Sequence, residues 1–400
     1  MKIGIIREGK VPPDKRVPLS PEQCKLVNDH IGVEVIIQKS EIRKFSDDQY
    51  IAQGLSVVDS VEDCDVLIGV KEVPESELIP DKKYLFFSHT YKEQPYNRSL
   101  LKSVLAKNIQ LVDWEVITNT KGVRLIAFGR YAGIVGCYNG LLGYGLKSKR
   151  YQLKRAQDCE DRAEMEGQLS VVDLPANFKI VLTGRGRVGG GALEVIKKMN
   201  MQEVTPEDFL NQQYDGPVYT QLGVHHYNKT KDGTAFDKKA FYDDPSQFDS
   251  NFLQYAKVAD MYIACHYWDS EAPYIFTRED AKDPDWNISI VADVSCDIDC
   301  AVASTLRPST IADPFYGYDA STETEVDFMD EGAIGVMAVD NLPCELPKDA
   351  SVDFGLMFIE HVLEPLKGND PENIIWRASE TKDGQLTPHF AYLKEYVNGN

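Results

Sequence analysis

The chain has 400 residues, 43% of them hydrophobic, which is enough for large buried cores. Because single cores stop growing near roughly 250 to 300 residues, we expect two domains with a ligand cleft between them. A formal net charge of −20 repels both a nucleic acid backbone and an anionic membrane surface, so we expect neither as a partner.

The N-terminus and the cysteines favour a cytoplasmic protein with reduced thiols. MKIGIIREGK lacks the pattern of a signal peptide, and no run approaches the roughly 18 apolar residues of a membrane span. The eight cysteines lack the dense spacing of a secreted disulfide scaffold. Cys296 and Cys300 have no second pair at zinc-finger spacing, so we expect no metal site.

The first half of the chain alternates short apolar runs with helix-like segments. The apolar runs lie at residues 2–8, 33–38, 65–72, 84–89 and 109–115. Helical patterns at 21–30 and 98–107 separate them. This alternation predicts a parallel sheet with crossover helices.

Three of these apolar runs end in polar residues: Lys71 and Glu72, His89 with Lys92 after it, and Glu115. For any one of them alone, a solvated strand end is the commoner explanation. In an open parallel sheet, however, ligands bind beyond the carboxyl ends of the strands, so we expect these residues to converge on one site. A lysine beside carboxylates and a histidine can act as general acid and base near neutral pH.

Two arginines are candidates for binding a substrate carboxylate. Arg16, in DKRVPLSP, precedes an expected helix start and could hold a carboxylate through two hydrogen bonds. Arg124, in GVRLIAFG, is the second candidate. For either residue alone, a surface ion pair is an equally good interpretation.

The middle of the chain predicts a connecting helix and a second α/β unit. A glycine-rich, helix-compatible stretch at 130–147 can pack closely against a neighbour and is our candidate for the connection between domains. A strand, a glycine loop and a helix follow at 178–199, with further strands at 260–268 and 288–297. Residues 213–250 have weak periodicity, and we expect a surface insertion there.

The glycine loop TGRGRVGGG places Gly184, Gly186 and Gly189 in the G-x-G-x-x-G pattern, with Arg187 and Val188 inside it. The first glycine permits a tight turn, the second lets the backbone approach a pyrophosphate, and the third lets helix and strand pack closely. A loop between a strand and a helix favours a dinucleotide site over a plain glycine turn.

The fingerprint also predicts an acidic residue about 20 residues further on, which would bind the adenine ribose. Thr205 occupies that place, and Glu207 lies just past it. The residues alone therefore leave both NAD and NADP open as cofactors.

The same segments resemble one enzyme family in sequence and in order. IGIIRE with KRVPLSP, VKEVPE, FFSHTYK, VDWE, RLIAFGRYAG, the glycine loop, VADVSCD and VDNLP resemble lysine-forming saccharopine dehydrogenase and the lysine-ketoglutarate reductase domain. Both are in the alanine dehydrogenase and transhydrogenase family. The resemblance implies an α/β fold with two Rossmann-like domains and parallel sheets. It also implies a substrate domain at 1–130 plus 320–400, and a dinucleotide-binding domain at 131–319.

The resemblance also implies roles for single residues and favours NAD over NADP. Lys71 and His89 match the family's acid and base, and Glu72 and Glu115 match carboxylates that tune them. Asp293 matches a strand-end aspartate near the nicotinamide. The residues that match substrate-side positive charges are Arg16, Lys92 and Arg124.

Three functions follow as hypotheses. The first is an NAD(P)-dependent oxidoreductase that condenses lysine with 2-oxoglutarate and reduces the imine to saccharopine, or catalyses the reverse reaction. The second is an alanine dehydrogenase or another opine-type amino-acid dehydrogenase. The third is a non-catalytic NAD(P)-binding or transhydrogenase-like subunit, against which Lys71 and His89 argue. The expected partners are small molecules, an amino acid and a 2-oxo acid, and the oligomeric state stays open.

Overall fold

The computed structural model describes residues 1–298 and 300–399, which form two compact units. Unit 1 comprises Met1–Phe128 and the residues from Pro347 onward, and unit 2 comprises Gly129–Leu346. We expected the second boundary near residue 320. It lies after Leu346 because the strands between residues 315 and 337 belong to the sheet of unit 2.

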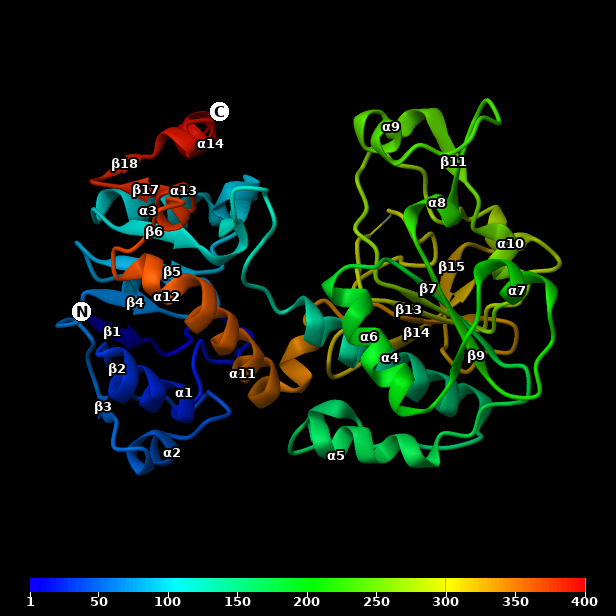
Figure 1. Ribbon diagram of the computed structural model, residues 1–400, viewed down its shortest axis with the longest axis horizontal. Helices are drawn as coiled ribbons and strands as arrows, with labels where there is room; N and C mark the ends of the chain where they lie inside the picture. The colour runs from blue at the N-terminus through cyan, green and yellow to red at the C-terminus, as the bar shows by residue number, and fades with distance from the viewer. Residues whose placement is uncertain (299, 400) are drawn as a thin grey trace. The chain divides into compact units, whose positions relative to one another are not determined.

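Unit 1 is built on a parallel sheet, as the alternation of strands and helices predicted. Over the described residues its strand order is β3-β2-β1-β4-β5-β6, and every neighbouring pair is parallel (Figure 1). The strands are β1 (Lys2–Ile5), β2 (Glu34–Gln38), β3 (Ser56–Val58), β4 (Val66–Ile68), β5 (Lys83–Phe86) and β6 (Gln110–Asp113). Their helices include α1 (Pro21–Leu26), α2 (Asp47–Ala52), α3 (Arg98–Ala106), α11 (Pro347–Met357), α12 (Leu363–Leu366), α13 (Ile374–Arg377) and α14 (Leu393–Asn398).

The start of α1 shows how local sequence sets an element. The Ser20 side chain accepts a hydrogen bond from the Gln23 amide at 3.3 Å, and the Gln23 side chain accepts one from the Ser20 amide at 2.9 Å. Pro21 occupies the first turn, where its missing N–H costs nothing. The serine, the proline and the glutamine together therefore fix the residue at which the helix begins.

The C-terminal segment of unit 1 runs antiparallel along β6. The Asp113 amide donates to the Ala378 carbonyl at 3.2 Å, and the Glu380 amide donates to the Leu111 carbonyl at 2.8 Å. A small antiparallel pair, β17 (Thr381–Lys382) and β18 (Gln385–Leu386), follows directly (Figure 1). Residues far apart in sequence are thus joined at one edge of the sheet.

Unit 2 contains the larger sheet, in the order β15-β14-β16-β13-β12-β7-β9-β8 within the described residues. The pairs from β16 to β8 are parallel, and β14 and β15 are antiparallel at one edge. The strands are β7 (Lys179–Thr183), β8 (Gln202–Glu203), β9 (Val218–Leu222), β12 (Met261–Ala264), β13 (Ile290–Asp293), β14 (Phe315–Asp319), β15 (Thr324–Val326) and β16 (Ile334–Met337). The helices include α4 (Gly129–Ser148), α5 (Arg162–Gly167), α6 (Arg187–Lys198), α7 (Pro206–Asn211), α8 (Val224–Tyr227), α9 (Lys238–Asp243) and α10 (Leu253–Ala256).

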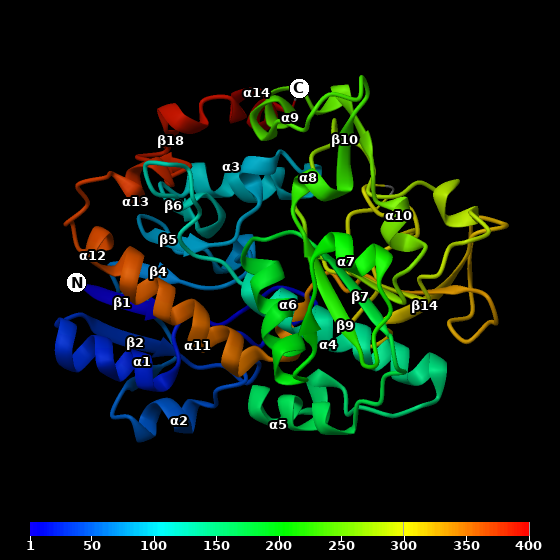
Figure 2. The same cartoon turned by 45° about the vertical axis from the view of Figure 1, so that its right-hand side comes forward.

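The expectation of a surface insertion at 213–250 is wrong for its first part. Strand β9 lies between β7 and β8, and Figure 2 shows it beside β7. Most of its residues are buried. Its burial comes from neighbours on both sides, which a short run such as VYTQL does not reveal. The rest of the stretch includes a separate antiparallel pair, β10 (Asn228–Thr230) and β11 (Phe248–Ser250).

Helix α4 is the first element of unit 2 and packs closely against α6, as its small residues predicted. A Cβ at Gly133 would lie 1.8 Å from the Val188 carbonyl oxygen. A Cβ at Gly191 would lie 2.0 Å from the Arg130 carbonyl oxygen. Only glycine allows the two helix backbones to approach this closely.

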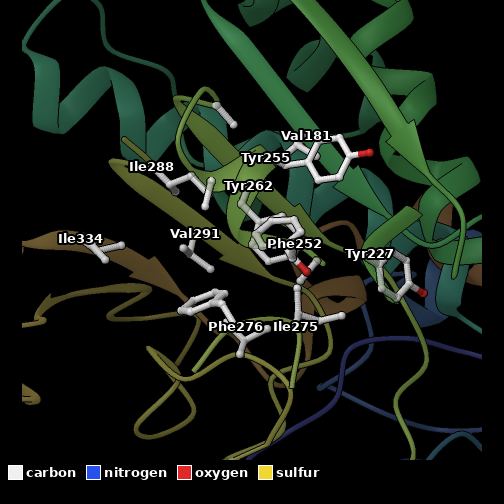
Figure 3. Packing of buried hydrophobic residues seen from close by; sticks show 14 of the residues in the cluster. Val181, Tyr227, Phe252, Tyr255, Tyr262, Ile275, Phe276, Ile288, Val291 and Ile334 are labelled. Atoms are coloured by element: carbon white, nitrogen blue, oxygen red, sulfur yellow. The ribbon is translucent and has the colours of Figure 1, made fainter. Parts of the chain in front are cut away.

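An aromatic-rich core holds the central strands of unit 2 in place. Figure 3 shows Phe252, Tyr262, Phe276 and Val291 gathered together, and all four are buried. The ring centroids of Phe252 and Tyr262 are 4.6 Å apart. Tyr262 belongs to β12 and Val291 to β13, so both strands pack into this core. No helix within residues 1–298 and 300–399 is long and apolar enough to cross a membrane.

Candidate active site

Polar residues gather at the carboxyl edge of the sheet of unit 1. Glu8 follows β1, Lys71 and Glu72 follow β4, His89 follows β5, and Glu115 follows β6. These four strands are neighbours in the sheet and all run in the same direction. The structure therefore brings together the three strand ends that the sequence singled out, and adds a fourth.

His89 lies between two carboxylates. Its Nδ1 is 2.8 Å from Glu72 Oε1, and its Nε2 is 3.8 Å from Glu115 Oε2. An ionised carboxylate only accepts hydrogen bonds, so Nδ1 carries the proton that points at Glu72. In the neutral imidazole, Nε2 is then the atom that can take up a proton.

Glu72 and Glu115 both stay ionised, although each is largely buried. Burial alone would raise the pKa of Glu72, but hydrogen bonds from His89 and Lys10 outweigh it and lower that pKa to about 2. Burial likewise opposes the ionisation of Glu115, but the charges of Lys92 and Arg124 lower its pKa. Lys92 Nζ is 3.0 Å and Arg124 Nη1 is 3.5 Å from the Glu115 carboxylate.

The side-chain ammonium of Lys71 lies at this edge and is available to a ligand. Within the described residues, no hydrogen bond or ion pair joins its side chain to a partner. Burial, followed by the charge of Arg16, lowers the pKa of its ammonium. A half-buried lysine of this kind can exchange a proton closer to neutral pH than a surface lysine does.

Glu8 fixes the backbone on which Lys71 stands. One carboxyl oxygen accepts the Val70 amide at 2.6 Å, and the other accepts the Lys71 amide at 2.8 Å. Burial raises the pKa of Glu8 to about 8. A buried carboxyl thus defines the direction in which the chain leaves β4.

Arg16 lies before α1, as expected, and is paired with Asp14. Arg16 Nη2 is 2.6 Å from Asp14 Oδ2, and the guanidinium carbon is 4.1 Å from the centre of the Phe128 ring. Burial would raise the pKa of Asp14, but the charge and hydrogen bonds of Arg16 outweigh it and hold that pKa well below its usual range. The guanidinium therefore already has one carboxylate partner inside the protein.

Sequence reasoning missed Glu8, Lys10 and Asp14. The signal for Glu8 was present, because the first apolar run also ends in polar residues, in REGK. Lys10 and Asp14 follow in an irregular loop, and only the fold shows that they meet Glu72 and Arg16. No local pattern in the sequence marks them.

Positive charge exceeds negative charge at this edge, although the whole chain has a formal net charge of −20. The ionised carboxylates are Asp14, Glu72, Glu115 and Asp113, the last of which lies at the end of β6 beneath His89. The cations in the same network are Lys10, Arg16, Lys71, Lys92 and Arg124. Such a local excess attracts small anions such as carboxylates.

The glycine loop of unit 2 has the geometry of a phosphate-binding turn. Gly184 has a φ of 92°, and its Cβ would lie 2.4 Å from the Cys265 carbonyl oxygen. A Cβ at Gly189 would lie 2.3 Å from the Gly184 carbonyl oxygen. In contrast, open space lies where a Cβ of Gly186 would be, among the described residues. The outer glycines are required by packing, and the middle one leaves the backbone accessible.

The surroundings of this loop fit a dinucleotide. Gly186 begins α6 without a side-chain cap, so amides of the first helical turn are available to a pyrophosphate. His266, at the end of β12, is fully buried, and its Nδ1 is 2.8 Å from Thr183 Oγ1. Its Nε2 has no hydrogen-bond partner in the described part of the chain. This buried polar atom is suited to a bound ligand.

The loop is joined to β9 and not to Thr205. Gln221 Nε2 donates to the Gly184 carbonyl at 2.8 Å, and Arg185 Nη2 donates to the Gln221 carbonyl at 3.1 Å. Thr205 caps α7, where its Oγ1 accepts the Asp208 amide at 3.1 Å. Because β8 is an edge strand, the residues after it lie one strand further from the loop than the residues after β9.

Asp293, at the end of β13, is fully buried, and both of its carboxyl oxygens are engaged. Oδ1 accepts the Ser295 hydroxyl at 2.6 Å, and Oδ2 accepts the Thr305 hydroxyl at 2.7 Å. Burial raises the pKa of this carboxyl. The structure therefore shows Asp293 holding its own loop, and its place near the nicotinamide stays a prediction. Arg187 is exposed in the first turn of α6, and Val188 follows it there.

Comparisons with known proteins agree with this arrangement. Residues 4–135 match the family model described as alanine dehydrogenase/PNT, N-terminal domain. Alpha-aminoadipic semialdehyde synthase of Mus musculus, described as mitochondrial, is 28% identical over 429 residues, which cover 96% of this chain and 46% of that protein. The chain thus spans about half the length of such relatives. Saccharopine dehydrogenase (NAD(+), L-lysine-forming) of Emericella nidulans is 26% identical over 410 residues, which cover 95% of this chain and 95% of that protein.

Solved structures show the same fold. An L-alanine dehydrogenase covers 100% of this chain with a TM-score of 0.64 at 15% identity. A transhydrogenase from Sinorhizobium meliloti covers 97% with a TM-score of 0.54 at 14% identity. The predicted α/β fold with two Rossmann-like domains is therefore confirmed. The match to the alanine dehydrogenase/PNT N-terminal domain model over residues 4–135 contains all the charged groups at the edge of unit 1 described above.

Proposed function

We propose that this chain is a nicotinamide-dependent oxidoreductase acting on CH–NH bonds, which condenses lysine with 2-oxoglutarate to saccharopine or catalyses the reverse reaction. One observation carries the proposal. Lys71, half buried and without an ion-pair partner among the described residues, lies at the same sheet edge as His89, which Glu72 orients. The names of relatives that match over nearly the whole chain support the choice of reaction and favour NAD, with NADP as the alternative.

The residues of unit 1 supply the proton transfers of this reaction. His89 Nε2 accepts a proton from the side-chain ammonium of the substrate lysine, so that the amine can attack the oxo carbon of 2-oxoglutarate. Lys71 donates a proton to the hydroxyl group that leaves the resulting carbinolamine as water, which produces the imine. When bound, NAD(P)H would supply the hydride for reduction of the imine carbon. The glycine loop, with Gly184, Gly186 and Gly189, would hold the pyrophosphate of that cofactor.

The charge of the edge suits these substrates. Both substrates bring carboxylates, and the cations at this edge outnumber its carboxylates. Lys92 and Arg124 are both partly exposed, and we assign them, with Arg16, to the substrate carboxylates. Substrate binding would then weaken the hold of Lys92 and Arg124 on Glu115 and couple binding to the surroundings of His89.

A coupled assay tests the proposal. Purified protein is mixed with lysine, 2-oxoglutarate and either NADH or NADPH, and oxidation of the cofactor is followed by absorbance. We expect oxidation that requires both substrates and is lost in Lys71→Met. Oxidation that requires pyruvate and ammonia instead would replace the proposal with alanine dehydrogenase activity. Binding of the cofactor without turnover on any of these substrates would replace it with a binding role.

A further inference from the structure

A chain of buried oxygen atoms lies directly beneath the His89 loop. Asp113 Oδ2 is 2.6 Å from Ser88 Oγ, which is 2.6 Å from Thr90 Oγ1. Thr90 Oγ1 is in turn 2.5 Å from Glu380 Oε2. All four side chains are fully buried. The two hydroxyls thus flank His89 in sequence and connect a carboxyl of β6 to a carboxyl of the C-terminal segment.

Counting protons shows that one of these carboxyls is neutral. Each of the three short O···O contacts needs a hydrogen atom, and the two hydroxyls supply only two. The third must come from a carboxylic acid, either Asp113 or Glu380. Two carboxylates this close to the same pair of hydroxyls would also repel each other in a buried site.

Asp113 is the ionised member of the pair. Its Oδ2 accepts the Ser88 amide at 2.7 Å and the His89 amide at 3.1 Å, in addition to the Ser88 hydroxyl. Its Oδ1 accepts the Glu115 amide at 2.6 Å. So many donors leave no place for a carboxyl hydrogen on Asp113. The proton therefore belongs to Glu380, which donates it to Thr90 Oγ1, and Thr90 then donates to Ser88.

We propose that Glu380 is a protonated positioning residue for His89, supplied by the C-terminal segment. This inference rests on the proposed role of His89. The hydrogen-bonded chain keeps the Asp113 carboxylate on the amides of Ser88 and His89. His89 has a φ of 55°, an uncommon left-handed conformation that these hydrogen bonds help to hold. Backbone hydrogen bonds to β6 hold Glu380 itself in place.

The groups around the pair agree with one shared proton. Burial, followed by the charge of Asp113, raises the pKa of Glu380 to about 8, so the acid is neutral at pH 7. Burial also raises the pKa of Asp113, which the charge of His89 opposes. The other titratable groups that face the pair are Tyr91, which interacts with Asp113, and Tyr392 and Tyr396 of the C-terminal segment, which interact with Glu380.

Kinetics of matched variants tests the inference. We expect Glu380→Ala to lower kcat by up to about 10²-fold, because a misplaced His89 loop costs that much. Glu380→Gln should restore most of this loss, since its amide N–H can donate to Thr90 as the acid does. Asp113→Asn should not be rescued in this way, because its amide nitrogen would meet backbone donors. Tolerance of Asp113→Asn together with failure of Glu380→Gln would place the proton on Asp113 and overturn the inference.

The pH profile supplies a readout that a merely structural role would not move. In the wild type, kcat/KM should fall as pH rises above about 8, where Glu380 loses its proton, and Glu380→Gln should remove that fall. Glu345→Gln is a matched control. Glu345 is a carboxyl of unit 2, and burial raises its pKa to about 7. The variant should leave the fall of kcat/KM above pH 8 in place. An unchanged fall in Glu380→Gln would contradict the inference.

Infrared spectroscopy separates this inference from the proposed function. A difference spectrum between the wild type and Glu380→Gln at pH 7 should contain the C=O band of a protonated carboxyl, whatever the enzyme catalyses. Absence of that band would overturn the assignment of the proton. A band that is present in a protein without oxidoreductase activity would instead leave the proton in place and refute only the proposed function.

Discussion

The two units use the carboxyl ends of their parallel strands in opposite ways. In both units a parallel sheet presents the carboxyl ends of its strands. In unit 1 these ends carry side chains with altered pKa values, Lys71 and Glu72 among them. In unit 2 the corresponding turn consists of glycines, and what it offers a ligand is backbone. Proton transfer needs groups that titrate, whereas holding a pyrophosphate needs amides and open space.

This difference predicts that the two edges will respond to substitution in different measurements. Changes in unit 1 should alter kcat and its pH dependence and leave cofactor affinity almost unchanged. Changes at the glycine loop should alter cofactor affinity first. The predictions below test this separation, from the largest expected effect to the smallest.

Loss of a proton-transfer group should have the largest effect. Lys71→Met and His89→Gln should each lower kcat by roughly 10²-fold to 10⁴-fold, the usual contribution of general acid and base catalysis. Steady-state kinetics measures this, and each variant should also lose a limb of the pH profile of kcat/KM. Fluorescence titration should show nearly unchanged cofactor affinity.

Lys83→Met is the matched control for that experiment. Lys83 is also a lysine of unit 1 whose pKa burial lowers, but it stands at the amino end of β5, at the other end of the strands from His89. We expect its variant to keep near wild-type turnover. Equal losses of kcat in Lys83→Met and Lys71→Met would show that burying a lysine, and not its place at the carboxyl edge, explains the effect.

Closing the open space at Gly186 should abolish cofactor binding in a folded protein. A valine side chain there would occupy the place of the pyrophosphate, and open space around the Cβ position means that the fold should accept it. Fluorescence titration with NADH and NADPH measures binding, and circular dichroism checks folding. Gly190→Ala, at another open position of α6, should bind normally. Normal affinity in Gly186→Val would exclude the loop as the binding site.

Glu8 should make unit 1 less stable as pH rises. Burial raises its pKa from an ordinary 4.5 to about 8 in the folded chain, so the folded state holds the proton more tightly. The stabilisation is complete below about pH 4.5 and is lost as pH rises through 8. Thermal unfolding across this range should therefore show a smaller decrease in Tm for Glu8→Gln than for the wild type. Parallel curves would show that Glu8 keeps an ordinary pKa.

Cofactor choice should change least. Thr205→Asp should favour NADH over NADPH by repelling a 2′-phosphate, and aspartate caps a helix as well as threonine does, so α7 should persist. We expect only a small change in the ratio of the two kcat/KM values, because Thr205 follows the edge strand β8. A large change would show that Thr205 reaches the ribose after all.

Parallel strand order explains how much of the site could be predicted. Lys71, His89 and Glu115 were found because the carboxyl ends of successive parallel strands meet at one edge, so chain order matched spatial order. For β8 and β9, chain order does not match spatial order, because β9 lies next to β7 and β8 lies at the edge of the sheet. The sequence pattern therefore points to Thr205, which follows β8, as the ribose contact. It does not indicate Gln221, which lies in β9 and contacts the glycine loop. Glu380 was beyond any local pattern, since only the long-range pairing with β6 places it beneath His89.

The two segments of unit 1 have a consequence for biosynthesis. Ala378 to Glu380 pair with β6, and these residues are made long after Met1–Phe128 has left the ribosome. Unit 2 is a single continuous stretch and can fold as soon as it emerges. Until then Met1–Phe128 lacks the segment that pairs with β6, so Asp113 and this edge of β6 are exposed to solvent. A nascent chain therefore completes the glycine loop of unit 2 before it can complete the edge of unit 1 that carries His89.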